Sequence, residues 1–68
     1  MKRIKELRTA KKITQQALAD VLHVTQQSVF KYEHDLAVPD VDILIACANY
    51  FETTVDYLVG NTDDPHRY

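Results

Sequence analysis

Glycine, cysteine and long apolar runs are scarce in this chain, and each scarcity argues against a class of protein. The single glycine argues against flexible linkers and glycine-rich phosphate loops. Cys47 is the only cysteine, so no disulfide can form within the chain, and we expect a buried thiol in a reducing cytoplasm. No apolar run approaches the roughly 20 residues of a membrane span. No apolar stretch follows the charged N-terminus, so a signal peptide is not expected.

The length and composition of the chain predict one small globular domain. Its 68 residues are 46% hydrophobic and 26% charged, which favours a packed core over disorder. The formal net charge is −2, yet six of the eight lysines and arginines precede residue 13, and the chain after Lys31 is acidic. A polyanion would approach the basic end, although a solvated first helix explains the same cluster equally well.

Apolar residues recur at helical spacing, and no segment alternates apolar and polar residues for long enough to form a strand. A first helix is expected from about residue 2 to residue 11. Thr14 and Thr25 are candidate N-caps of a second and a third helix. The inward-facing residues predicted for these two helices are Ala17, Leu18, Val21 and Leu22, then Val29, Tyr32 and Glu33.

The second half of the chain predicts two more helices. Asp40 and Thr54 are their candidate N-caps, and Gly60 supplies a left-handed stop. The core stripe predicted for the fourth helix is Val41, Leu44, Ile45, Ala48 and Phe51. We therefore expect an all-α, five-helix domain at residues 1–60, followed by a loose polar tail at residues 61–68.

The second and third helices are joined by about three residues, which is the spacing of a helix-turn-helix unit. The outer face of the third helix would carry Gln27 and Lys31, flanked by Gln26 and Phe30, and no carboxylate. Glutamine can pair with adenine in the major groove, and lysine with guanine or a phosphate. Phe30 could touch a thymine methyl group or pack on a neighbouring side chain, and packing is the favoured interpretation.

Several short motifs, in this order and at this spacing, resemble the lambda-repressor and Cro-like helix-turn-helix family, also called the XRE family. The resemblance covers about residues 3–60. The motifs are Arg3-Ile4-Lys5-Glu6-Leu7-Arg8, Ile13-Thr14-Gln15, Leu18-Ala19, His23-Val24-Thr25, Tyr32-Glu33, Pro39 and Thr54-Val55-Asp56-Tyr57-Leu58-Val59-Gly60.

This resemblance implies a compact, lambda-repressor-like domain of bacterial or phage origin that regulates transcription, with repression as the expected action. It implies an ion pair between Arg8 and Glu33, and a Gln15 side chain that contacts phosphate and braces the reading helix. The base contacts that it implies are Gln26, Gln27 and Lys31. The phosphate contacts expected are Gln15, Thr25, Ser28, Lys11 and Lys12.

Two features depart from the family pattern. His23 occupies a turn position that is often glycine, where a left-handed backbone would cost about 1 kcal/mol. The loop after the third helix, residues 35–38, is acidic and apolar where the family usually carries basic residues. We therefore expect modest DNA affinity with a strong dependence on salt.

The family reads two half-sites about 34 Å apart, which implies a homodimer bound to double-stranded operator DNA. Ile43 and Tyr50 share a second face of the fourth helix, and Tyr57 lies near them in the fifth. These three residues are the predicted dimer interface, and burial beneath the C-terminal tail is the alternative.

A protein-binding module such as an antitoxin is the competing interpretation, because the second half is acidic. An enzyme is not expected: the histidines at positions 23, 34 and 66 show no metal-ligand spacing, and no base is expected near Cys47. We expect neither a cofactor nor a small-molecule ligand, and we expect a cytoplasmic protein without a membrane partner.

Overall fold

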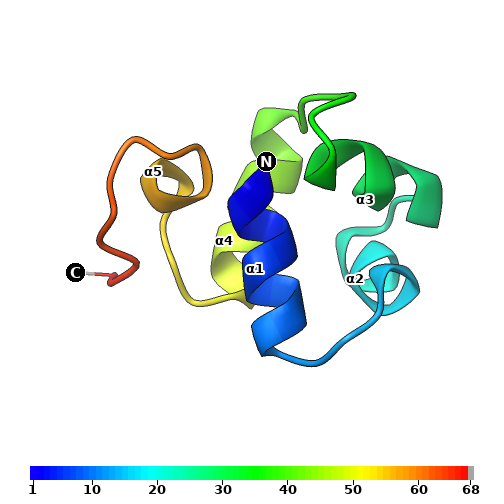
Figure 1. Ribbon diagram of the computed structural model, residues 1–68, viewed down its shortest axis with the longest axis horizontal. Coiled ribbons are helices and arrows are strands. Elements are labelled where there is room, and N and C mark those ends of the chain that lie inside the picture. Colours follow the sequence, from blue (N-terminus) through cyan, green and yellow to red (C-terminus); the bar gives the residue numbers. More distant parts are fainter. Residues whose placement is uncertain (68) are drawn as a thin grey trace.

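The computed structural model describes residues 1–67, so Tyr68 of the predicted tail lies outside the described residues. The regular elements are α1 (Lys2–Ala10), α2 (Gln15–Leu22), α3 (Gln26–Glu33), α4 (Val41–Tyr50) and α5 (Val55–Leu58). Figure 1 shows α1 crossing the middle of the molecule, with α2 and α3 on one side and α5 with the tail on the other. The expected all-α, five-helix fold is confirmed. None of the described helices is long and apolar enough to span a membrane.

Four of the five helices begin at the polar residue that the sequence predicts. The side chains of Thr14, Thr25, Asp40 and Thr54 accept hydrogen bonds of 2.9–3.1 Å from backbone N–H groups three residues further along. Each cap satisfies one of the N–H groups that a helix start leaves without a partner, which contributes about 1 kcal/mol. The starts of α2 to α5 are therefore set by local chemistry.

Just after the helices, residues with a left-handed backbone conformation end each helical segment. Among those in residues 1–67, only Gly60 is a glycine. His23 has a φ of 56°, and the backbone N–H of Val24 donates to the Ala19 carbonyl at 3.0 Å. This hydrogen bond closes a Schellman-type turn. Lys12, Asp35 and Glu52 also have positive φ, whereas the sequence predicts such a backbone only at His23 and Gly60. Each non-glycine residue in this region costs about 1–2 kcal/mol.

The core lies between the helices, where α3 packs on α1 and α2, α4 packs on α2 and α5, and α1 also packs on α5. Its buried hydrophobic residues are Ile4, Leu18, Ala19, Leu22, Val29, Cys47, Ala48 and Leu58. Burying one such large side chain contributes about 1.5–3 kcal/mol. Because Cys47 is fully buried, its pKa rises from 9.0 to about 11, as expected for an inert core thiol.

Two of the predicted inward-facing stripes need correction. Val21 in α2 is 39% exposed, whereas Ala19 is buried in its place. In α4, Val41 and Ile45 are 68% and 47% exposed, so the predicted stripe was wrong at both positions. Apolar residues surround almost the whole of α4, so spacing alone does not distinguish its inner face, which is set by packing against α2 and α5.

Residues 61–67 of the C-terminal tail are attached to the domain by hydrogen bonds, in contrast to the loose segment expected from the sequence. Arg3 in α1 pairs with Asp63 at 2.5 Å. The buried hydroxyl of Thr53 donates to the Pro65 carbonyl at 2.7 Å, and Arg67 Nε donates to the Thr53 carbonyl at 3.0 Å. Residues distant in the sequence provide these partners, which is why the tail composition did not reveal them.

Candidate nucleic-acid interface

The helix-turn-helix unit consists of α2, the connection at residues 23–25, and α3. Val29 and Glu33 of α3 are buried against the rest of the domain. The first turn of α3 lies at the surface, with Gln26 and Gln27 both exposed. The N-terminal half of α3 can therefore enter a groove without rearrangement of the chain.

The outer face of α3 carries two rows of side chains, because residues four apart on a helix are neighbours. One row contains Gln27 and Lys31, and the other contains Gln26 and Phe30. All four side chains are exposed. The only carboxylate of α3 belongs to Glu33 and is buried, so a phosphate or base edge approaching this face meets no negative side chain.

Glu33 is held in a clamp that joins three helices. Arg8 Nε donates to Glu33 Oε2 at 2.6 Å and a second guanidinium nitrogen to Oε1 at 3.2 Å. Gln15 Nε2 also donates to Oε1, at 3.1 Å. The Glu33 side chain is 0% exposed, and that of Arg8 is 15% exposed. The ion pair connects α1 to the end of α3. Because water is largely excluded, each of the two charges is compensated by its partner.

Gln15 links this clamp to the reading face. Its amide nitrogen is bonded to Glu33, so its Oε1 faces the opposite way and lies 3.5 Å from Gln26 Nε2. The contact is long for a hydrogen bond, yet it directs the amide of Gln26 toward the amide of Gln15. A buried ion pair therefore orients Gln15, and Gln15 in turn guides the first side chain of α3.

The residues expected to contact phosphate lie at the starts of α2 and α3 and in the turn between α1 and α2. Thr25 Oγ1 accepts from the Ser28 backbone N–H and lies 3.0 Å from the Ser28 hydroxyl. Lys11 and Lys12 are exposed in the turn that leads into Gln15 at the start of α2. The Lys11 ammonium lies 5.1 Å from the centre of the Tyr50 ring. Helix N-termini attract anions, so these positions suit a phosphate backbone.

Arg3 does not contribute to a free basic end. Its guanidinium donates to the Thr62 carbonyl and to Asp63, and stacks 4.1 Å from the centre of the Tyr57 ring. By its place in the sequence, Arg3 is one of the cations expected to attract a polyanion. Only the folded chain brings it against the acidic tail.

The three residues predicted for a dimer interface are all half-buried within this chain. Ile43 and Tyr50 pack against the core. Tyr50 also lies edge-on to Phe51, and Tyr57 lies beneath Arg3. The apolar side chains most exposed on the loop and α4 are instead Leu36, Val38, Val41 and Ile45.

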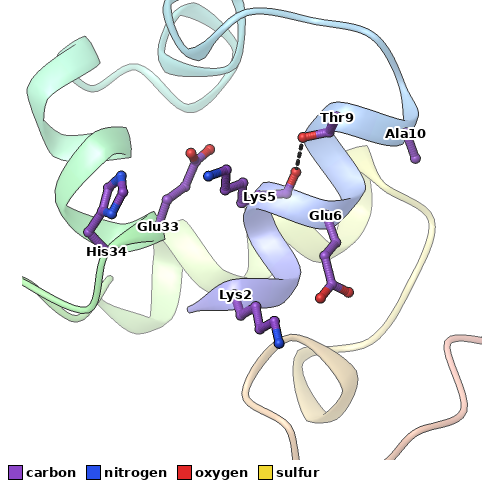
Figure 2. A pocket seen from close by; sticks show the side chains of 7 residues that line it. All are labelled: Lys2, Lys5, Glu6, Thr9, Ala10, Glu33 and His34. Atoms are coloured by element: carbon purple, nitrogen blue, oxygen red, sulfur yellow. Dashed lines mark hydrogen bonds between the residues drawn. The ribbon is translucent and has the colours of Figure 1, made fainter.

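A hollow of about 610 Å³ lies between α1 and the end of α3. Figure 2 shows its lining, with Lys5 extending toward Glu33. Its remaining lining residues are Lys2, Glu6, Thr9, Ala10 and His34. The Glu33 carboxylate that lines this hollow is already held by Arg8 and Gln15. Among residues 1–67, no cluster of three or more His, Cys, Asp or Glu side chains could hold a metal ion.

Comparison with known proteins identifies the family. The sequence pattern of the helix-turn-helix family matches residues 4–58, which include α2 and α3. This chain belongs to the XRE-type helix-turn-helix family. The family relationship inferred from the short motifs is therefore confirmed.

Curated relatives of this helix-turn-helix protein are named as transcriptional regulators and not as enzymes. YobD of Bacillus subtilis strain 168, an uncharacterised regulator, is 36% identical over 63 residues, covering 93% of this chain and 56% of YobD. ImmR of the same organism is 34% identical over 62 residues, covering 91% of this chain and 49% of ImmR. This chain thus spans about half the length of the curated relatives it matches.

A solved structure shares the helix-turn-helix fold described above. The P22 c2 repressor, crystallised with a synthetic operator, superposes with a TM-score of 0.80 and 28% identity. The match covers 84% of this chain and 86% of the repressor chain. The five helices of this chain therefore form a lambda-repressor-like domain.

Proposed function

We propose that this chain is a sequence-specific DNA-binding repressor that reads the major groove with α3 and acts as a homodimer. The observation that carries this proposal is the outer face of α3, where Gln26, Gln27 and Lys31 are exposed and the only carboxylate is buried. Family membership and the likeness to the P22 c2 repressor, whose structure contains a synthetic operator, support it.

Base recognition rests on the two glutamines and the lysine. Each glutamine amide presents a donor and an acceptor, which match N7 and the N6 amino group of adenine. Lys31 reaches guanine O6 and N7, or a phosphate. A good base contact contributes about 1–3 kcal/mol of discrimination, and Gln15 restricts Gln26 before DNA arrives, which lowers the entropic cost of that contact.

Phosphate contacts set the register of α3 on the duplex. Gln15 and Thr25 begin α2 and α3, where backbone N–H groups and the helix dipole favour anions, and Ser28 lies in the first turn of α3. Lys11 and Lys12 add positive charge beside α2. Because the loop at residues 35–38 carries no lysine or arginine, fewer phosphates are neutralised, and we expect modest affinity whose salt dependence is set by the lysine contacts that remain.

Two copies are required to place two α3 helices in successive major grooves about 34 Å apart. We assign the contact between copies to the exposed apolar residues Leu36, Val38, Val41 and Ile45, in place of the half-buried residues at 43, 50 and 57. This patch begins three residues after α3 ends, so a second copy seated there would lie beside the reading helix. The acidic residues around it, Asp35, Asp40 and Asp42, disfavour DNA as its occupant.

A dimer bound across a promoter would block access of RNA polymerase, which is the basis of the proposed repression. The action requires no cofactor, because the contacts above come from side chains and backbone alone. The proposed location is the cytoplasm, where both DNA and the polymerase are available.

Selection of duplexes from a random pool tests the proposal directly. We expect enrichment of an inverted repeat whose half-sites are about one helical turn apart. Gln27→Ala should relax preference at one base pair and leave the salt slope unchanged. Lys31→Ala should weaken binding to all sequences and reduce the slope by about one if the lysine contacts phosphate. Lys2→Ala, which removes an exposed lysine of α1, is the matched control.

A protein-binding module such as an antitoxin is the second candidate, favoured by the exposed apolar patch and its acidic surroundings. It predicts that no duplex is enriched and that the chain is not retained on heparin at low salt. Enrichment of an operator that depends on Gln27 would exclude a module that acts through protein contacts alone.

A further inference from the structure

Phe30 is an apolar side chain on the proposed reading face that the contacts above leave without a role. It is 45% exposed, although its position on α3 is between the polar residues Gln26 and Lys31. The Phe30 ring contacts the imidazole of His34, with 4.2 Å between the ring centroids and 38° between the ring planes. The packing of Phe30 on a neighbouring side chain therefore exists, yet nearly half of the side chain remains open to an external partner.

The position of Phe30 on α3 is defined relative to Gln26. The two residues are four apart, so Phe30 lies on the same row, about 6 Å further along the helix axis. Successive bases on one DNA strand are about 3.4 Å apart along the axis of the duplex. A reading helix that lies in the groove with Gln26 at one base pair thus brings Phe30 near the pair one or two steps away.

The chemistry of the major groove decides what can meet this ring. Nearly all groups on the base edges there are hydrogen-bond donors or acceptors, and an aromatic ring set against them would remove water from these groups without replacing its bonds. The 5-methyl group of thymine is the apolar feature that distinguishes one base pair from the others. We infer that Phe30 reads a thymine methyl group within the half-site, an inference that rests on the proposed function.

His34 is assigned as a positioning residue for this contact. Its imidazole lies against one side of the Phe30 ring at the C-terminal end of α3, and it contributes no base contact in this assignment. Stacking restricts the ring to fewer orientations, so less conformational freedom is lost when the ring meets the methyl group. The effect of His34 should therefore appear only on operators that carry the methyl.

The experiment compares a selected operator with the same operator in which uracil replaces thymine at one position of each half-site. This change removes only the methyl group. The positions tested are those one and two base pairs from the pair that Gln27→Ala and Gln26→Ala relax. We expect the wild-type chain to bind the thymine operator about fourfold more tightly per half-site, which corresponds to burial of about one methyl group.

Phe30→Ala should reduce this thymine-to-uracil ratio to about one, and Phe30→Leu should keep part of it. His34→Ala should lower the ratio while affinity for the uracil operator stays the same. Val59→Ala removes another exposed apolar side chain, distant in sequence from α3, and should retain the wild-type ratio. Circular dichroism verifies that each variant is folded, and Phe30→Leu carries the test if Phe30→Ala is not.

A wild-type ratio that persists in Phe30→Ala overturns the inference, as does a selected operator with no thymine at the tested positions. A full ratio in His34→Ala overturns the positioning role alone. Failure of the wild-type chain to enrich any duplex has a different meaning, because it removes the proposed DNA-binding function itself.

Discussion

Removing Arg8 should reveal how strongly the clamp around Glu33 supports the domain. Arg8→Ala leaves a carboxylate that is 0% exposed without its cation, and among the described residues only Gln15 still donates to it. Loss of one partner from a buried ion pair costs about 3–5 kcal/mol. At about 0.05–0.15 kcal/mol per residue, a chain of 68 residues has a total unfolding free energy of about 3–10 kcal/mol. The variant should therefore be largely or partly unfolded.

Urea denaturation followed by circular dichroism measures this loss. For a slope of about 1 kcal/mol per molar urea, the expected midpoint shift is at least about 3 M. The control is Asp20→Ala, which removes an exposed side-chain hydrogen bond of 2.9 Å from Gln16 and should change stability by less than about 0.5 kcal/mol. A loss below about 1 kcal/mol for Arg8→Ala would refute the reasoning, because the carboxylate would then be solvated despite its burial.

The double variant Arg8→Met with Glu33→Met separates stability from DNA binding. Apolar replacement of both partners of a buried pair is often neutral or stabilising, so most of the midpoint should return. Gln15 loses its acceptor, however, and the chain of contacts to Gln26 is broken. We expect near-normal stability with weaker and less selective operator binding. Wild-type selectivity in the folded double variant would show that the brace is unnecessary.

Three further predictions concern the turn, the thiol and the dimer. His23→Gly should raise the unfolding free energy by about 0.5–1 kcal/mol in urea melts, because glycine relieves the left-handed φ of 56° at a smaller cost in chain entropy; no gain would show that the turn is unstrained. Cys47 should react with iodoacetamide at pH 8 at least about a hundredfold more slowly in the native chain than in urea, because a pKa of about 11 instead of 9.0 lowers the thiolate fraction from about 9% to about 0.1%. The same shift stabilises the fold below pH 9, and its contribution is lost as the pH rises toward 11; equal alkylation rates would contradict the burial. Ile45→Asp should abolish dimers in analytical ultracentrifugation while Val59→Asp retains them, and an unchanged association constant for Ile45→Asp would remove the patch from the interface.

Local chemistry in the sequence was sufficient for much of this fold. The N-caps at Thr14, Thr25, Asp40 and Thr54 act within three residues, so each could be located without knowledge of the tertiary structure. The same holds for the spacing of α2 and α3, and for a third helix that places Val29 inward and Gln27 outward. These features depend on helical periodicity, which the sequence carries directly.

The tertiary structure alone decided which apolar and charged residues remain available. Ile45 matches the core spacing of α4 as well as Ala48 does, but only packing against α2 and α5 buries one and exposes the other. From the sequence, Arg3 is expected to be a free cation. In the fold it pairs with Asp63, which lies almost the whole length of the chain away in sequence. Such outcomes depend on contacts between distant segments, and periodicity within one segment contains no information about its neighbours.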